Sequence, residues 1–327
     1  MKKYIKLLYY PFYTVLFFIT SSVPKKKSLW LFSAWQGQRF LDNSKYFYLY
    51  VRQNHKDIDS IWITKSKDLY ASLKKQNYAV AYAYSIKGLW LQMRAGFVFY
   101  THSVDLDFYS PWVGWKTKRI QLWHGIPMKK IGYDDLLQNN NFQKLKKVFF
   151  PFLIDRHDLI IACSEYDKKI FESAFNTDSN RIVVTGYPRY DYLYDLNEKY
   201  KNIVEDTENK CNSVLYLPTF RGEEGSDFEL FDKYGFNFSE FDSFLLKNNI
   251  NFYIKLHPVQ KLNKQNKDII LNSQRVFFVK NDEDINDYII KANATIIDYS
   301  SIYFDLLFLE RKIIFAPFDL NEYLAVD

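Results

Sequence analysis

Short runs of β-branched and aromatic residues alternate with longer amphipathic stretches from residue 28 onward, and this alternation limits the chain to few folds. Strands that alternate with helices are typical of a parallel sheet covered by helices. We therefore expect an α/β protein with two series of parallel strands. The first series comprises residues 29–33, 60–64, 97–101, 119–123, 159–163 and 182–185, and the second comprises 214–217, 252–256, 276–279, 295–297 and 312–316.

A polar stretch, Tyr192–Asn212, separates the two series of expected strands. It has many charges and few apolar residues, and 327 residues are enough for two domains that each bury a core. We expect Rossmann-like domains at 28–200 and 201–327, with their parallel sheets facing a cleft. Ligands of open parallel sheets bind at the carboxyl ends of the strands, so residues that follow strands are the candidate site residues.

The first 27 residues carry the whole net charge of +6, because they contain six lysines and no acidic residue. The lysines flank an apolar, aromatic segment, 7–23, that is only about long enough to cross a bilayer. Basic flanks attract anionic headgroups, which favours a membrane-associating helix in segment 1–27 that lies in the interface. A true span, an ordinary core helix and a cleaved signal peptide stay open as alternatives. The lysines are Lys2, Lys3, Lys6, Lys25, Lys26 and Lys27.

Composition narrows the functional class. The chain is 48% hydrophobic and 25% charged, which is typical of a globular protein, and its 27 Tyr and 29 Phe fit a large core, a carbohydrate surface or a membrane contact. Cys163 and Cys211 lie far apart in sequence, so we expect no disulfide framework, no Cys-based metal site and a reducing compartment. No basic stripe follows residue 27, so we expect no nucleic-acid partner.

The segment Gln121–Gly132 brings one histidine and two lysines to the end of an expected strand. Gly125 is expected to let the backbone turn there. His124 then lies at a strand-to-loop edge, either as a reactive group or as a structural histidine that ties down the turn. Lys129 and Lys130 follow in the same loop.

A doubled serine follows the expected strand at 295–297. The sequence Asp298-Tyr299-Ser300-Ser301 precedes a helical pattern that runs from Ile302 to about Leu309. A helix start offers free backbone N–H groups and the positive end of the helix dipole, and serine hydroxyls add donors. The segment is therefore a candidate phosphate site, with a plain helix cap as the alternative.

Three further basic groups follow expected strands. His257 has Lys255 two residues earlier on the same face, so the pair can neutralise a diphosphate, or it can be a turn histidine beside a solvent-facing lysine. Arg221 ends another strand segment, where a guanidinium can bind phosphate oxygens in a bidentate way. Arg189 is a similar candidate, with a turn residue that pairs with Asp191 as the alternative.

Several signatures are missing from the sequence. The chain has ten glycines and neither a G-x-G-x-x-G motif nor a Walker A loop, which argues against a dinucleotide oxidoreductase and a P-loop kinase. It also lacks the G-x-S-x-G elbow of serine hydrolases. Asp105-Leu106-Asp107 resembles a metal-binding D-x-D, but we expect these carboxylates to be solvated in a polar loop. We expect neither a metal nor a cofactor.

These segments together resemble the CDP-glycerol glycerophosphotransferase family, which includes the teichoic-acid glycerol- and ribitol-phosphate transferases and related bacterial capsule polymerases. The resemblance lies in the motifs and their order, from about Leu29 to Tyr323. Ser44 stands where the family usually has proline. The segments that carry the resemblance are Asp42–Lys45, Trp123–Lys130, Gly186–Arg189, Pro218–Arg221, His257-Pro258 and Asp298–Asp305.

The resemblance implies a GT-B-type fold and transfer of glycerol phosphate or ribitol phosphate from a CDP-alditol donor, with release of CMP. The acceptor would be a hydroxyl of a growing, lipid-linked teichoic acid or capsule polymer at the cytoplasmic face of the bacterial membrane. His124 would act as general base, with His257 as a second catalytic group at the diphosphate. The expected substrate-binding residues are Lys129, Lys130, Arg189, Arg221, Lys255, Asp298, Ser300 and Ser301.

Two other functions fit the same pattern. A nucleotide-sugar-dependent glycosyltransferase of similar architecture also needs a nucleotide-diphosphate site, but attack then occurs at an anomeric carbon. A membrane-bound binding or scaffold subunit is the non-enzymatic alternative. Family members usually continue beyond the segment that corresponds to Asp319–Tyr323, so we expect a truncated or minimal second domain.

Overall fold

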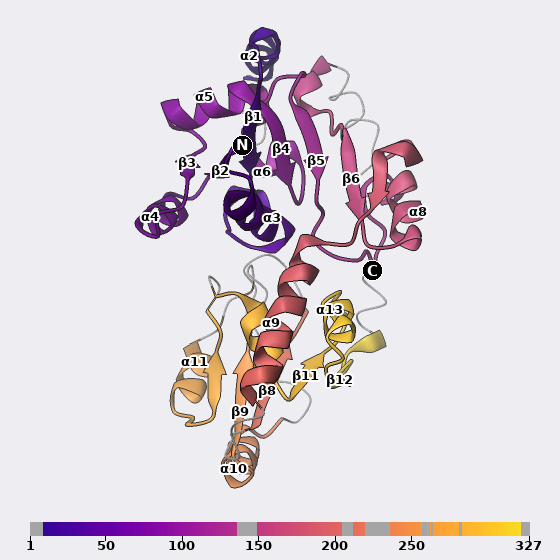
Figure 1. Cartoon of the computed structure of the whole chain (residues 1–327). Coiled ribbons are helices and arrows are strands. Elements are labelled where there is room, and N and C mark those ends of the chain that lie inside the picture. The colour runs from indigo at the N-terminus through magenta and orange to yellow at the C-terminus, as the bar shows by residue number, and fades with distance from the viewer. Residues whose placement is uncertain are drawn as a thin grey trace. The chain divides into compact units, whose positions relative to one another are not determined.

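The chain consists of two compact units, unit 1 at Met1–Asp191 and unit 2 at Tyr192–Asp327. The structure is a computed structural model, and it describes residues 9–135, 149–204, 212–219, 236–256, 260, 262, 264–280 and 283–321. Each unit contains its own parallel sheet (Figure 1). The fold is therefore α/β with two parallel sheets, as the alternation of the sequence predicts.

Unit 1 is built on seven parallel strands in the order β3-β2-β1-β4-β5-β6-β7. The order reverses between β1 and β4, so the polypeptide winds outward from the middle of the sheet in both directions. A parallel sheet wound in this way places a ligand site outside the carboxyl ends of its central strands. The strands are β1 (Lys26–Phe32), β2 (Asp59–Thr64), β3 (Val80–Tyr82), β4 (Ala95–Tyr100), β5 (Lys118–Gln121), β6 (Leu159–Ala162) and β7 (Ile182–Val184).

Both faces of the unit 1 sheet are buried. Phe32 and Phe99 pack into a cluster on one face, while their neighbours Leu31 and Val98 pack into a cluster on the other. Strands buried on both faces are continuous apolar runs, which is why they can be recognised in the sequence. The helices of this unit are α2 (Tyr10–Ser22), α3 (Asp42–Asn54), α4 (Lys67–Lys75), α5 (Ile86–Arg94), α6 (Val104–Asp107) and α8 (Glu165–Ala174), with short 3₁₀ turns η1 (Trp35–Gly37), η2 (Ser110–Trp112), η3 (Gly132–Asp134), η4 (Pro151–Leu153) and η5 (Ser179–Arg181).

The strands expected from the sequence are all present, although their ends shift. One strand, β3, was not expected, because its three residues include an alanine and give too short an apolar run. The expected strand at 119–123 was wrong at its end, since β5 stops at Gln121. Trp123 takes the left-handed backbone region with φ 53°, which interrupts the extended conformation.

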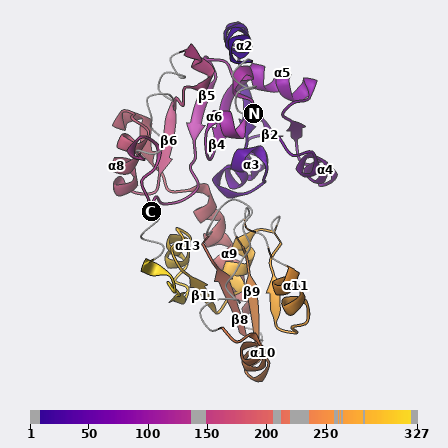
Figure 2. The same cartoon turned by 180° about the vertical axis from the view of Figure 1, so that it is seen from behind.

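Helix α2 packs against unit 1 at the amino ends of the strands, as Figures 1 and 2 show from opposite sides. Phe17 and Thr20 are its buried residues, and the Thr20 hydroxyl donates to the Pro111 carbonyl at 3.1 Å. Gly114 allows this close approach, because a Cβ there would come within 2.7 Å of the Ser21 backbone. Within the described residues, no helix has the length and hydrophobicity to span a membrane.

Unit 2 is built on five parallel strands in the order β10-β9-β8-β11-β12. Its core centres on Phe252 and Ile254 of β9, which pack with Tyr216, Leu245 and Ile270. The strands are β8 (Asn212–Leu217), β9 (Ile250–Ile254), β10 (Val276–Phe278), β11 (Ala294–Ile297) and β12 (Ile313–Phe315), and the helices are α10 (Phe238–Lys247), α11 (Lys264–Leu271), α12 (Ile285–Lys291) and α13 (Tyr303–Phe308).

The division between the units falls within helix α9 (Pro188–Val204). The sequence placed the boundary between residues 200 and 201, inside a stretch whose low apolar content suggested a junction. The structure shows a continuous helix there up to Val204. The polar composition of Tyr192–Asn212 therefore includes much of a helix rather than only a linker. The expected cleft concerns the relative placement of the two domains and stays a prediction.

Candidate active site

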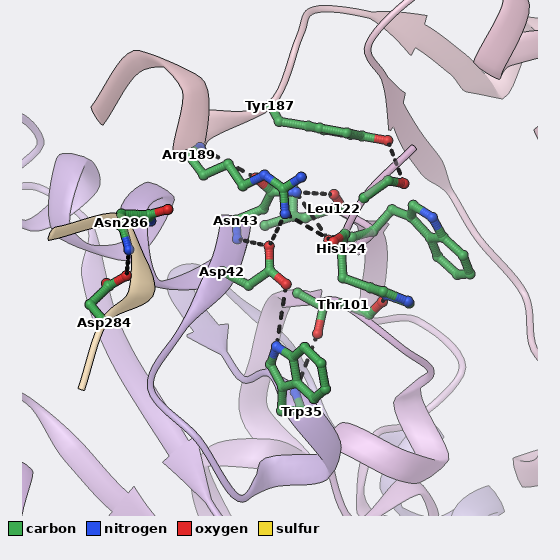
Figure 3. Close-up of polar contacts among 12 residues, drawn as sticks. Trp35, Asp42, Asn43, Thr101, Leu122, His124, Tyr187, Arg189, Asp284 and Asn286 are labelled. Atoms are coloured by element: carbon green, nitrogen blue, oxygen red, sulfur yellow. Dashed lines mark hydrogen bonds and ion pairs between the residues drawn. The ribbon is translucent and has the colours of Figure 1, made fainter. Parts of the chain in front are cut away.

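Four loops at the carboxyl ends of the unit 1 strands converge around His124 (Figure 3). They follow β1, β4 and β5, which are adjacent strands in the middle of the sheet, and β7 at its edge. His124 lies three residues beyond the end of β5. Gly125 was expected to supply the turn, but the residue with a left-handed backbone conformation is Trp123, one residue before the histidine.

The His124 ring is held in one tautomer. Its Nδ1 lies 2.8 Å from the carbonyl oxygen of Thr101, which follows β4. A carbonyl oxygen can only accept, so Nδ1 carries the hydrogen and Nε2 carries the lone pair. Among the described residues, Nε2 has no hydrogen-bond partner. The reactive nitrogen of His124 is thus the one free to accept a proton.

A second histidine lies against His124. The ring of His102 stacks on it, with centroids 4.5 Å apart and planes inclined by 12°. The Trp123 ring also lies close to His124, with its centroid 4.2 Å from that of the imidazole. Burial, and to a smaller extent the nearby His102, lowers the pKa of His124 to about 4. Burial also lowers the pKa of His102 to about 4. Both imidazoles are therefore neutral at pH 7, which is the state that a general base requires.

A buried ion pair holds the His124 backbone. The Arg189 guanidinium lies 3.3 Å from the Asp42 carboxylate, and the same Nη1 donates to the His124 carbonyl at 2.9 Å (Figure 3). The side chains of Arg189 and Asp42 are 10% and 7% exposed. The sequence offered Asp191 as an alternative partner, but the structure pairs Arg189 with Asp42 from the start of α3. Arg189 is thus engaged in positioning the loop of His124.

Side chains of Asn43 and Tyr187 also hold the His124 loop by hydrogen bonds to its backbone carbonyls. Asn43, fully buried, donates through Nδ2 to the carbonyls of Leu122 at 3.0 Å and Trp123 at 3.1 Å. The Tyr187 hydroxyl donates to the Gly125 carbonyl at 3.3 Å. Hydrogen bonds therefore hold each consecutive carbonyl from Leu122 to Gly125. Such over-determination keeps a loop in a strained conformation.

Left-handed backbone conformations gather around His124. Trp35, Asp42 and Trp123 have φ values of 50°, 67° and 53°. The Trp35 ring lies 6.2 Å from that of His124, and its Nε1 donates to Asp42 at 3.3 Å. Strained residues persist where the surroundings determine them, and they are common at functional sites. This concentration supports a functional site at His124.

Asp107 was expected to be a solvated carboxylate, and this expectation was wrong. Its side chain is fully buried and accepts three backbone N–H groups, from Thr101, His102 and Gln36. Asp105 from the same motif is exposed. Helix α6 turns one carboxylate inward and the other outward, so the D-x-D spacing does not bring the two together. No group of three or more potential metal ligands occurs among the residues that the structure describes.

Lys129 and Lys130 are exposed in the loop that follows His124. Met128 beside them is also exposed, at 53%. The role of the two lysines as substrate-binding residues stays a prediction.

In unit 2, the segment after β11 contacts the segment after β8. The Asp298 carboxylate accepts from the Thr219 backbone N–H at 3.0 Å and from the Tyr299 N–H at 2.7 Å, and the Thr219 hydroxyl donates to it at 2.5 Å. Ser300 accepts from the Ile302 N–H at 3.4 Å, and Ser301 is half-buried beside it. The structure thus shows Asp298 joining two strand ends, while the phosphate-binding roles of the serines stay predictions.

Lys255 follows β9 and is held by backbone carbonyls. Its Nζ donates to Lys280 at 2.7 Å and to Glu283 at 3.0 Å. The ammonium therefore ties the loop after β10 to the end of β9. His257 and Arg221 lie outside the described residues, so their predicted roles are neither supported nor opposed by the structure.

Sequence reasoning missed four residues of this site, namely Asp42, Asn43, His102 and Asp107. His102 lies two residues beyond the end of β4, so the rule that polar residues after strands form the site already pointed to it. Asp42 and Asn43 belong to a segment noted for its resemblance, but no role was assigned to them. Asp107 gave no sequence signal that distinguishes a buried carboxylate from a solvated one.

A family model described as CDP-Glycerol:Poly(glycerophosphate) glycerophosphotransferase matches residues 15–326. The teichoic acid glycerol-phosphate transferase of Staphylococcus aureus (strain NCTC 8325 / PS 47) is 29% identical to this chain over 338 residues, which cover 97% of the chain and 80% of the relative. The teichoic acid poly(glycerol phosphate) polymerase of Bacillus subtilis (strain 168) is 26% identical over 95% of this chain and 41% of its own length. The chain thus spans less than half of that larger polymerase.

Solved structures agree with this assignment at the level of the fold. The wall teichoic acid polymerase TagF superposes with a TM-score of 0.72 and 21% identity, over 98% of this chain and 78% of that chain. A UDP-GlcNAc 2-epimerase from Neisseria meningitidis superposes less well, with a TM-score of 0.53 and 14% identity over 88% of this chain and 81% of the epimerase. The chain belongs to the CDP-glycerol:poly(glycerophosphate) glycerophosphotransferase family.

Proposed function

We propose that the protein transfers glycerol phosphate or ribitol phosphate from a CDP-alditol to a hydroxyl of a growing teichoic acid or capsule polymer and releases CMP. The observation that carries the proposal is the neutral His124, whose tautomer leaves Nε2 as a proton acceptor at the carboxyl edge of the unit 1 sheet. Family membership supplies the class of donor.

In this reaction His124 Nε2 takes the proton of the acceptor hydroxyl while the hydroxyl oxygen attacks the donor's β-phosphorus. The bond from that phosphorus to the bridging oxygen breaks, and CMP leaves with the electron pair. Because burial holds the pKa of His124 near 4, the imidazolium is a strong acid and passes its proton on to CMP or solvent. A positioned base contributes about 10²–10⁴-fold to the rate.

The diphosphate of the donor needs positive charge and N–H donors around it, because negative charge grows on the bridging oxygen as CMP departs. We assign this task to His257, Arg221 and the Ser300-Ser301 segment, with Lys129, Lys130 and Lys255 contributing positive potential. Arg189 differs from these residues, because its guanidinium already pairs with Asp42. We therefore give Arg189 a role in positioning His124.

The protein works at the cytoplasmic face of the membrane, with α2 lying in the interface. Its outward face exposes more than half of Phe12, Val15, Phe18 and Ile19. Thirteen residues extend about 20 Å, less than the roughly 30 Å of a bilayer core, so the helix fits the interface better than a span. The His124 loops lie at the opposite edge of the sheet, about 20 Å away by the length of β1. That distance suits an acceptor whose growing end extends away from its lipid anchor.

Flotation with vesicles of phosphatidylglycerol and phosphatidylethanolamine tests the membrane contact. The double variant Phe12→Glu/Ile19→Glu should stay with the soluble fraction, since it places charge on the outward face of α2. The matched control is Tyr50→Glu, because Tyr50 is an exposed aromatic residue of α3 at 54%. Equal flotation of both variants would contradict the proposal that α2 contacts the membrane.

Donor selectivity tests the proposed reaction. Purified protein is incubated with a lipid-linked acceptor and, in turn, with CDP-glycerol, CDP-ribitol and sugar nucleotides, and the transferred group is identified by mass spectrometry. We expect the acceptor to gain an alditol phosphate and the donor to yield CMP. Transfer of a sugar without phosphate would establish a glycosyltransferase instead, and absence of any transfer would favour a binding subunit.

A further inference from the structure

The buried Asp107 carboxylate organises the loop that carries the hydrogen-bond partner of His124. Its Oδ2 accepts from the N–H groups of Thr101 at 2.9 Å and His102 at 3.0 Å. Its Oδ1 accepts from the Gln36 N–H at 2.7 Å. All three contacts are donated to the carboxyl group, and an ionised carboxylate accepts them without needing a hydrogen of its own. One side chain thus joins the loops after β1 and β4.

The position of Asp107 is itself fixed by helix α6. Ser103 caps this helix by accepting from the Leu106 N–H at 3.1 Å, and the Ser33 hydroxyl donates to the Asp107 carbonyl at 2.9 Å. Gly37 packs so closely that an added Cβ would come within 3.0 Å of the same carbonyl. The carboxylate therefore has little freedom to move away from the N–H groups that it binds.

Two hydrogen bonds in series connect Asp107 to the His124 ring through the backbone of Thr101. Asp107 binds the N–H of Thr101, and the carbonyl of Thr101 accepts the Nδ1 hydrogen of His124 at 2.8 Å. We propose that Asp107 is a positioning residue that fixes the tautomer and orientation of His124 through the Thr101 backbone. Only the catalytic consequence of this inference rests on the proposed function, because the tautomer exists without substrate.

The charges around both groups support this arrangement. His102, Asp42 and Arg189 face His124, and Asp42 raises the pKa of His124 while the other two lower it. Burial raises the pKa of the Asp107 carboxyl, and the backbone N–H groups that it binds and then Lys65 oppose this rise. Loss of one carboxylate oxygen would leave at least one of these N–H groups without its acceptor and let water into the loop. The pKa of His124 would then move from about 4 toward its usual value of 6.5.

The variant Asp107→Asn tests the proposal, because it keeps the shape and removes one acceptor oxygen. The NH₂ of the asparagine amide, whether it takes the place of Oδ1 or of Oδ2, would face a backbone N–H and cannot accept its hydrogen bond. Asp105→Asn is the matched control on the same helix. Asp105 is exposed and accepts from the Ser110 hydroxyl at 2.8 Å, away from the Thr101 loop.

The direct readout is nitrogen NMR of protein labelled at its five histidines, with the His124 signals assigned by their loss in His124→Asn. Wild type and Asp105→Asn should show His124 with hydrogen on Nδ1 and titration near pH 4. Asp107→Asn should show mixed tautomers and a titration that lies at least about one pH unit higher. The acid limb of its kcat/KM profile should shift in the same direction, and kcat should fall at least about tenfold.

The inference is overturned if folded Asp107→Asn keeps the wild-type tautomer and titration of His124. It is also overturned, whatever the variant does, if wild-type His124 carries its hydrogen on Nε2. The NMR readout needs no turnover. If wild-type protein transfers no alditol phosphate, the proposed function therefore fails, while the tautomer measurement still decides the role of Asp107.

Discussion

Breaking the buried Asp42–Arg189 ion pair should destabilise unit 1 far more than breaking an exposed pair. The perturbation is a double-mutant cycle with Asp42→Asn, Arg189→Met and both together. Asparagine suits position 42, because its φ is 67° and asparagine tolerates the left-handed region. Methionine keeps much of the arginine stem and removes the charge.

The magnitude follows from the 3.3 Å separation and the low exposure of both side chains, 10% and 7%. At an effective dielectric of 20, two unit charges at that distance attract by about 5 kcal/mol, which is partly offset by their desolvation. Removing one partner leaves the other charge buried, so each single variant should lose about 3–5 kcal/mol of unfolding free energy. The double variant should cost at least about 1 kcal/mol less than the sum of the singles.

Urea denaturation followed by circular dichroism measures these free energies. The control cycle uses Lys26 and Asp59, which form an ion pair at 2.5 Å with side chains 52% and 51% exposed. That pair should contribute no more than about 1 kcal/mol. Additive costs for Asp42 and Arg189, within about 0.5 kcal/mol, would refute the reasoning that they act as a coupled pair.

Three further outcomes are expected. The pKa of His124 is about 4 in the folded protein and about 6.5 in the unfolded chain. Acidification from pH 6.5 to 4 should therefore lower the free energy of unfolding by up to about 3 kcal/mol. The variant His124→Asn should flatten the dependence of the urea midpoint on pH. Gly114→Ala should lower the melting temperature, because its Cβ would meet the Ser21 backbone at 2.7 Å; an unchanged melting curve would contradict that packing. Asp298→Asn should cost about 1–3 kcal/mol in denaturation, since Asp298 accepts from both the N–H and the hydroxyl of Thr219, and a cost below 0.5 kcal/mol would count against this contact.

Most of the sheet architecture could be predicted from the sequence, because parallel strands buried on both faces are apolar runs separated by helical stretches. The strand β3 could not be predicted in this way, because it has only three residues. The end of β5 was misplaced for another reason. Trp123 is as apolar as a strand residue, and only the contacts around it impose its left-handed backbone.

The position of His124 could also be predicted, since it follows from the rule that ligand sites lie after strands. The electrostatic environment of His124 could not be predicted from the sequence. The acceptor of its Nδ1 hydrogen is a backbone carbonyl, Thr101, which has no side-chain signature. Arg189 and Asp42 are 147 positions apart, so their pairing exists only in the folded chain. Asp107 belongs to a D-x-D spacing that is usually seen with metals. Its side chain is fully buried, so the spacing does not indicate a metal site here.

The most direct test of the central claim compares two single histidine substitutions in the alditol phosphate transfer assay. His124→Asn removes the proposed proton acceptor, while His55→Asn alters an exposed histidine at the end of α3. We predict that His124→Asn lowers kcat at least about 100-fold with little change in the donor KM, and that His55→Asn matches wild type. A His124→Asn variant that retains wild-type kcat would contradict the assignment of His124 as the base.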